Sequence, residues 1–140
     1  MKDRGEINIA VANYFDNNFH DFSILNRRDG NNVQSKDELR HIIIGRWYYG
    51  LYLLAKEKLG KQYISHTGYF DKNNKRKLGI WETLDDNAKI KGLSYDFEKN
   101  GTLLFDMRNR YEYNGINVPD TMFQKAQTIY EDMYNELQNI

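Results

Sequence analysis

Cysteine is absent from this chain of 140 residues, which excludes disulfides, thiolate metal ligands and cysteine nucleophiles. Proline occurs once, at Pro119, and no segment sustains the alternation of apolar and polar residues that is typical of strands. The most apolar stretch, residues 47–55, is far shorter than the roughly 20 residues that a membrane span needs. The charged start of the chain is followed by no apolar signal core. We therefore expect an all-α cytoplasmic protein.

Charge of one sign is not in excess either, because 20 Lys and Arg residues balance 20 Asp and Glu residues. Bulk charge therefore gives no attraction to nucleic acid or to an anionic membrane, and any such binding requires a local patch. The 40% hydrophobic and 14% aromatic content is enough for a core. No repeat or low-complexity linker divides the chain, so we predict a single domain over residues 1–140.

The spacing of apolar residues predicts four long helices and a short one, arranged as an up-and-down bundle. A capping box that begins at Ser35 is expected to start the second helix, and Gly60 is expected to end it. Gly101 is expected to bend the fourth helix, and Pro119 suits the first turn of the last one. The expected helices cover residues 7–25, 35–59, 75–84 and 88–113, and a last one carries a stripe from Met122 to Leu137.

The same spacing indicates which side chains form the core. The second helix is apolar almost all round, which is typical of a helix in the middle of a bundle. The short helix is expected to turn three residues inward, and the stripe on the fourth helix includes Ile90. The inward residues of the short helix are Leu78, Trp81 and Leu84, and the predicted core includes Trp47, Leu51, Leu54, Leu104 and Met133.

Familiar catalytic and metal-binding motifs do not occur. His20, His41 and His66 lie in separate predicted elements, so no two form a helical ligand pair, and we expect neither a metal site nor a cofactor. The most basic stretch is a loop of residues 72–77 that follows Tyr69 and Phe70. Its cations and rings suit phosphate binding and base stacking, although composition alone favours a solvated loop. The RNA-binding candidates in and beyond this loop are Lys75, Arg76, Lys77 and Arg110.

A second group of charged residues ends the fourth predicted helix. Arg108 and Arg110 are two positions apart, so they cannot share one helix face. Arg46 lies in the apolar second helix and is expected to need a carboxylate partner, with Asp106 and Glu112 as the candidates. On physical grounds alone, a buried salt-bridge network that joins two helices explains these charges.

Three segments resemble the HEPN superfamily of small helical proteins. Residues 46–55 (RWYYGLYLLA) are similar to the second-helix signature of that superfamily, and residues 107–113 (MRNRYEY) are similar to its arginine–polar segment. His66-Thr67-Gly68 is similar to the loop between them, and the last helix matches in position. The resemblance covers residues 35–140. It implies an all-helical bundle, a homodimer that pairs the second and fourth helices around one cleft, and an RNA-directed role in prokaryotic defence, stress or toxin–antitoxin systems.

The resemblance also implies which residues would act on RNA. Ribonucleases of the superfamily carry an arginine, a polar residue and a histidine five to seven positions after the arginine. Arg108 and Asn109 match the first two places, and Tyr113 stands where the histidine is expected. Tyrosine is a poor base at pH 7. The resemblance therefore implies either an atypical metal-independent endoribonuclease that uses these three residues or a non-cleaving RNA binder. The alternative is a protein-interaction module, such as the partner of a nucleotidyltransferase antitoxin.

Overall fold

The computed structural model describes residues 2–17, 39–114 and 116–140, and this part of the chain is mainly helical. A π-helical turn, η2 (Asn109–Tyr113), continues the α-helix that ends at Arg108, and two short strands pair in a hairpin. The predicted all-α class is thus confirmed, with a two-stranded addition. The helices are α1 (Lys2–Asn17), α3 (Arg40–Leu59), α4 (Ile80–Ile90), α5 (Phe97–Arg108) and α6 (Asp120–Leu137), and the strands are β1 (Tyr69–Phe70) and β2 (Arg76–Lys77).

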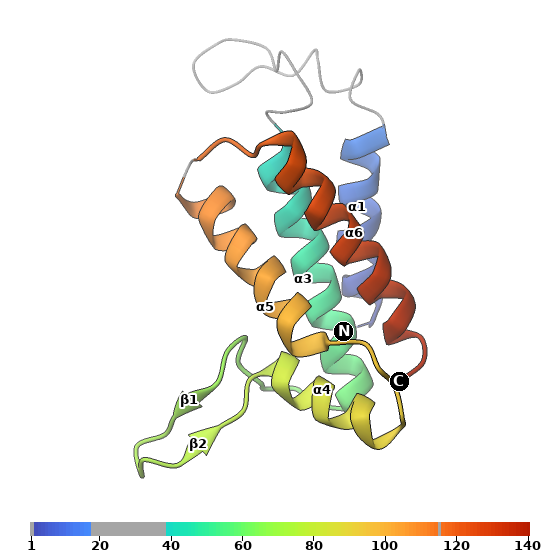
Figure 1. Ribbon diagram of the computed structural model, residues 1–140. Helices are drawn as coiled ribbons and strands as arrows, with labels where there is room; N and C mark the ends of the chain where they lie inside the picture. Colours follow the sequence, from blue (N-terminus) through green and yellow to red (C-terminus); the bar gives the residue numbers. More distant parts are fainter. Residues whose placement is uncertain (1, 18–38, 115) are drawn as a thin grey trace.

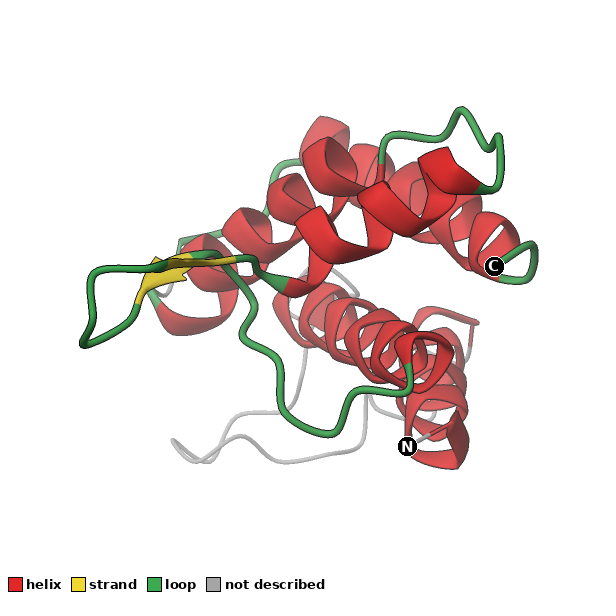
Figure 2. Cartoon of the chain, turned by 90° about the horizontal axis from the view of Figure 1, so that it is seen from below, coloured by secondary structure: helices red, strands yellow, loops and turns green. Residues whose placement is uncertain are grey.

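Helix α3 is the centre of the bundle and contacts α1, α4, α5 and α6. Figure 1 shows the four long helices α1, α3, α5 and α6 alternating in direction, with α4 across the lower end of the bundle. Viewed from below, the hairpin extends beyond the helices on one side (Figure 2). The near-continuous apolar composition of α3 suits its place among four neighbours, because most of its faces are covered.

Two glycines allow α1 to approach α3 closely. A Cβ atom on Gly5 would lie 2.9 Å from the carbonyl oxygen of Gly50, so the two helix backbones are in contact there. Any larger residue at either position would push the helices apart or displace the side chains around them. This contact fixes the distance between α1 and α3.

Gly60 ends α3 as predicted. Its φ of 63° lies in the left-handed region that favours glycine, and its N–H donates to the carbonyl of Glu57. Lys56 and Lys58 lie in the last turn, where positive charge complements the helix dipole. The predicted capping box at Ser35 and the predicted residues 18–25 of the first helix lie outside the described residues.

The predicted short helix over residues 75–84 is displaced. Residues 76–77 form β2 of the hairpin, and α4 begins only at Ile80. The hairpin turn depends on Asp71, whose carboxylate accepts from the backbone N–H groups of Asn73 and Lys75, both at 2.9 Å. Leu78 therefore lies between β2 and α4 and is 43% exposed, so its predicted inward position is wrong. The predicted burial of Trp81 and Leu84 is confirmed by the structure.

The predicted fourth helix is in fact two helices. α4 ends at Ile90, Gly92 adopts a positive φ of 76°, and the carboxylate of Asp96 caps α5 by accepting from the N–H of Lys99. Ile90 then lies at an exposed helix end and is 85% accessible, which contradicts its predicted place on the buried stripe. The buried carboxylate of Asp85 accepts from the N–H of Phe97 at 3.0 Å and ties α4 to α5 across the break.

Gly101 has a role in packing. A Cβ atom there would lie 2.2 Å from the indole ring of Trp81, so the absence of a side chain lets that ring rest on α5. The five residues named as core in the long helices are all buried, and they come from α3, α5 and α6. Among the described residues, no helix combines the length and the apolar character that crossing a membrane requires. The confirmed core residues are Trp47, Leu51, Leu54, Leu104 and Met133.

Candidate functional site

The π-helical turn places Tyr113 beside Arg108. A π-helical turn pairs residues five apart, and Tyr113 is five positions after Arg108. The guanidinium lies 5.1 Å from the centre of the Tyr113 ring and donates from Nη2 to the tyrosine hydroxyl. Its Nε atom faces a carboxylate oxygen of Glu112 at 3.4 Å. Arg108, Asn109 and Tyr113, the three residues singled out in the sequence, therefore fall within one turn, with Arg108 and Tyr113 in direct contact.

Tyr48 of α3 provides a second ring for the same guanidinium. The guanidinium carbon of Arg108 lies 5.4 Å from the centre of the fully buried Tyr48 ring. The indole of Trp81 meets Tyr48 edge-on, and its Nε1 lies 3.3 Å from the Tyr48 hydroxyl. Arg108 is thus held between two tyrosine rings, an arrangement that restricts the guanidinium without neutralising its charge.

His66 reaches the same tyrosine from the loop that follows α3. Its Nδ1 lies 2.5 Å from the Tyr48 hydroxyl oxygen. Its ring stacks on Tyr52, with 4.0 Å between ring centres, and on Phe105 of α5 at 5.3 Å. The loop histidine is therefore packed against aromatic rings of both α3 and α5.

The contacts of Tyr48 bear on which nitrogen of His66 carries the proton. An indole N–H can only donate, so the Tyr48 oxygen accepts from Trp81. The contact between the Tyr48 hydroxyl and Nδ1 of His66 has two possible directions, and in the one where the tyrosine donates, Nδ1 accepts. Neutral His66 in that tautomer carries its proton on Nε2, and that nitrogen forms no hydrogen bond with any of the described residues.

Burial and charge keep both rings neutral near pH 7. Partial burial lowers the pKa of His66 to about 4, and the positive charges of Arg108 and Lys56 add to this effect. Burial raises the pKa of Tyr48, although the hydrogen bond from Trp81 and the charge of Arg108 oppose the rise. At neutral pH the side chains around Tyr48 thus offer one permanent cation, Arg108, and one neutral N–H donor, His66.

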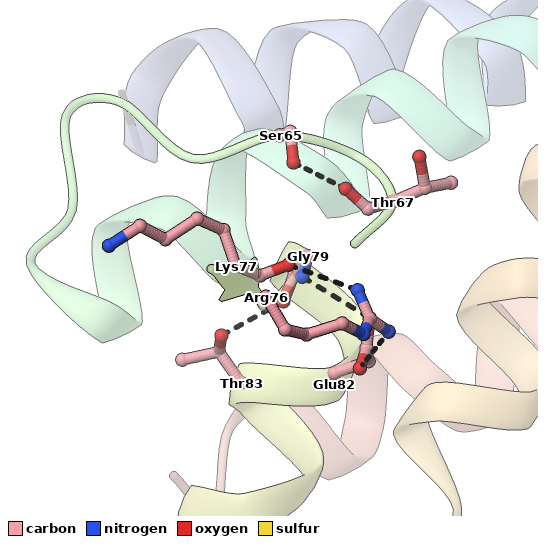
Figure 3. Close-up of polar contacts among 7 residues, drawn as sticks. All are labelled: Ser65, Thr67, Arg76, Lys77, Gly79, Glu82 and Thr83. Atoms are coloured by element: carbon pink, nitrogen blue, oxygen red, sulfur yellow. Dashed lines mark hydrogen bonds and ion pairs between the residues drawn. The ribbon is translucent and has the colours of Figure 1, made fainter. Parts of the chain in front are cut away.

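The root of the hairpin holds the loop of His66 in place (Figure 3). The N–H of Ile80 donates to the carbonyl of Ser65 at 2.8 Å, next to the histidine. Arg76 donates from Nη2 to both carboxylate oxygens of Glu82, at 2.9 and 3.1 Å, and Glu82 also accepts from the N–H of Gly79. These contacts fix the point where the loop meets the start of α4.

Three of the four predicted RNA-binding cations lie apart from Arg108, and the fourth, Arg110, lies in η2. Lys75, Arg76 and Lys77 belong to the hairpin, whereas η2 lies at the upper end of α5 (Figure 1). Arg76 is paired with Glu82, and Nζ of Lys77 lies 3.9 Å from Asp71, so part of the charge of the hairpin is compensated. Arg110 is exposed and rests over the ring of Tyr111 at 5.8 Å.

The predicted partner of Arg46 is wrong. Arg46 is exposed, and its Nη1 donates to the side-chain oxygen of Asn8 on α1 at 3.0 Å. Asp106 is also exposed, and Glu112 is the ion-pair partner of Arg108. The physical reason is that Arg46 lies on the edge of α3 next to a polar residue of α1. It keeps access to water there and needs no carboxylate.

Three residues of this site, His66, Tyr48 and Tyr52, are not among those that the sequence predicts. The separate position of His66 indicates a structural or solvated residue, and the two tyrosines belong to the apolar pattern of the second helix. The one signal in the sequence is the His66-Thr67-Gly68 segment, which is part of the HEPN resemblance. The contact of His66 with α5 joins residues far apart in the sequence, so residue spacing does not predict it.

In the described part of the chain, no group of three or more His, Asp or Glu side chains is placed to hold a metal ion.

Comparisons of this chain with protein-family models, with curated proteins and with solved structures found no match. The HEPN resemblance therefore stays a prediction based on residues 46–55, 66–68 and 107–113. The geometry around Tyr48 is independent of that resemblance.

Proposed function

We propose that this protein binds RNA by holding a backbone phosphate between the guanidinium of Arg108 and the Nε2–H of His66. The observation that carries the proposal is that both side chains contact one buried ring. Nδ1 of His66 lies 2.5 Å from the hydroxyl of Tyr48, and the Arg108 guanidinium lies 5.4 Å from the centre of the same ring. Two side chains from distant parts of the chain thereby contact one ring.

The chemistry of these donors suits a phosphate. A guanidinium offers several N–H groups in one plane and forms strong charge-assisted hydrogen bonds to phosphate oxygens. Its position between Tyr48 and Tyr113 reduces the entropy lost on binding. Glu112 pairs with the Nε atom of Arg108 at 3.4 Å, so a phosphate has to compete with this carboxylate for the guanidinium. Because the chain has no net charge, affinity must come from such a local group.

Binding without cleavage fits the site better than catalysis. A histidine with a pKa of about 4 holds no second proton at pH 7, so it cannot serve as a general acid, and it is a weak base. Tyr113 occupies the place of the expected histidine, and its hydroxyl is engaged by Arg108. The proposal is therefore a non-cleaving RNA binder, with the atypical endoribonuclease as the alternative that an RNA gel tests directly.

The proposed assembly is a homodimer that places two copies of Arg108 at one cleft. The support is the HEPN resemblance, together with the neutral overall charge, because a second copy doubles the local concentration of cations. Light scattering at working concentration measures the mass of the particle. A role in defence, stress or toxin–antitoxin systems stays a prediction of the same resemblance.

The main test compares Arg108→Ala with Arg110→Ala. The two substitutions remove the same charge two residues apart, one from the site and one from an exposed position. We expect Arg108→Ala to weaken binding of a labelled unpaired RNA about tenfold, and Arg110→Ala to weaken it less. Fluorescence anisotropy at low salt gives the affinity, and thermal melting of each variant shows that the fold is kept.

Three outcomes contradict the proposal in different ways. Equal losses for the two variants mean that Arg108 contributes only charge. A lower melting temperature for Arg108→Ala with unchanged affinity means that Arg108 only joins helices. A wild-type protein that is monomeric and binds no RNA at low salt leaves the protein-interaction module as the better explanation.

A further inference from the structure

A pocket rich in tyrosine lies next to the proposed phosphate site. It has a volume of about 340 Å³ and lies between the last turns of α3 and the loop that leads to β1. Three of the residues that line it are tyrosines, and one is a lysine. The residues important here are Tyr52, Tyr63, Tyr69, Lys56, Gln62 and Ser65.

Tyr52 belongs both to this pocket and to the His66 group. Its ring lines the pocket and also stacks on His66, with 4.0 Å between the ring centres. Its hydroxyl donates to the carbonyl of Ile64 at 2.6 Å, so the ring is fixed in orientation. The ammonium of Lys56 lies 5.3 Å from the centre of the same ring. Tyr52 therefore lines the pocket and also contacts His66 of the proposed phosphate site.

The other two tyrosines present large ring surfaces to solvent. Tyr63 is 87% exposed and Tyr69 is 50% exposed, although aromatic rings of this size normally gain by burial. Rings held at the rim of a pocket offer stacking surfaces for flat ligands, and every nucleobase has such a face. The side-chain amide of Gln62 adds a donor and an acceptor at the same rim.

We propose that this pocket is a subsite for an unpaired nucleobase of the RNA that Arg108 and His66 hold by its phosphate. The inference rests on the proposed function and adds the substrate class, which is single-stranded RNA. A base inside a duplex is already stacked and cannot enter the pocket, whereas an unpaired base can turn outward and stack on protein rings. Lys56 lies at the edge, where it attracts the neighbouring phosphate.

The experiment measures the affinity of two labelled probes for the full chain by fluorescence anisotropy. One probe is an unpaired RNA of about ten nucleotides, and the other is an abasic ribose-phosphate chain of the same length and charge. We expect Tyr63→Ala and Tyr69→Ala each to weaken binding of the RNA about tenfold and to leave binding of the abasic chain unchanged.

Phe70→Ala is the matched control. Phe70 is the neighbour of Tyr69 on β1 and is 65% exposed, but it does not line the pocket, and the guanidinium of Arg76 covers it at 5.9 Å. We expect this variant to bind both probes as the wild type does. Circular dichroism and thermal melting establish that each variant keeps the fold.

Arg108→Ala separates failure of the subsite from failure of the proposed function. If Arg108→Ala weakens binding of both probes while Tyr69→Ala behaves like Phe70→Ala, the subsite is overturned and phosphate binding stands. If Arg108→Ala leaves both affinities unchanged, phosphate binding at this site is overturned, and the subsite that depends on it falls too. If wild-type protein binds a duplex of equal length as tightly as the unpaired RNA, the assignment to single strands is wrong.

Discussion

Trp47 and Tyr48 are neighbours on α3, and they contact different parts of the molecule. The ring of Trp47 stacks on Tyr130 of α6, with 4.9 Å between centres and 4° between planes, and on Phe123 at 5.5 Å. Its indole N–H donates to Asn13 of α1 at 3.1 Å. Each of these partners belongs to a helix of the bundle.

The Tyr48 side is also rich in aromatic rings but differs in chemistry. It holds a cation, a histidine and a buried hydroxyl, and it draws them from α5, a loop and α3. Aromatic content alone therefore does not separate a structural cluster from a candidate site. The difference lies in whether the rings surround polar groups that still reach solvent, as they do at Arg108, whose side chain is 17% exposed.

The largest effect is expected on the Trp47 side. Trp47→Ala removes a fully packed ring and leaves a cavity between α3 and α6, so we expect a loss of about 3–5 kcal/mol in the free energy of unfolding. Urea denaturation followed by circular dichroism measures it. Tyr49→Ala, at the 38% exposed position two residues later, is the control and should cost less than about 1 kcal/mol. Similar losses for the two variants would mean that α6 does not pack on α3 through the Trp47 ring.

A smaller effect is expected on the Tyr48 side, and it depends on pH. The pKa of His66 is about 4 in the fold and 6.5 in its ordinary state. Between these values the unfolded chain binds a proton that the folded chain does not bind. The contribution of neutral His66 to the free energy of unfolding is therefore fully present above about pH 6.5, and it is lost as the pH falls towards 4. The full shift corresponds to about 3 kcal/mol, and solvent screening of this half-buried ring reduces it to about 1–2 kcal/mol.

The measurement compares wild type with His66→Gln in urea melts between pH 4 and 7. The wild type should lose stability more steeply than the variant as pH falls, because the variant has no group to protonate at this position. Carboxylates titrate in both proteins, so only the difference between the two curves counts. Parallel curves would show that His66 is solvated and does not accept the hydrogen bond from Tyr48.

The two sides also differ in how well the sequence predicts them. The Trp47 side follows from the apolar spacing of α3 and α6, which by itself places Met133 and Leu54 in the core. Gly60 likewise marks the end of α3, because a left-handed residue there favours glycine. These features arise from local patterns, so one sequence is enough to identify them.

The Tyr48 side depends on contacts that no local pattern encodes. The hairpin is set by the turn at Asp71 and Asn74, and its two-residue strands are too short to give an alternating pattern. It shifts the start of α4 and brings the loop of His66 against α5. In the sequence, only the resemblance of residues 107–113 suggests that Arg108 and Tyr113 act together. The contact of Arg108 and His66 with the same ring is visible only in three dimensions.

The smallest effect is expected at Arg46, which precedes Trp47 and belongs to neither side. The apolar pattern around it predicts a buried carboxylate partner, and hence a destabilised bundle when Arg46 is removed. In the structure it is exposed and donates one hydrogen bond to Asn8. Arg46→Ala should therefore change the free energy of unfolding by about 0.5 kcal/mol or less, because water replaces an exposed hydrogen bond at little cost.

Asn8→Ala removes the other partner of the same contact, and the double variant shows whether the two effects couple. We expect each single variant and the double variant to melt close to the wild type, and Arg46→Ala to keep the RNA affinity of the wild type because its guanidinium is tied to α1. A loss above about 2 kcal/mol for Arg46→Ala alone would restore the buried pair predicted from the sequence. Arg46 would then belong to a buried network, whereas in the structure it is exposed on α3 and contacts Asn8 of α1.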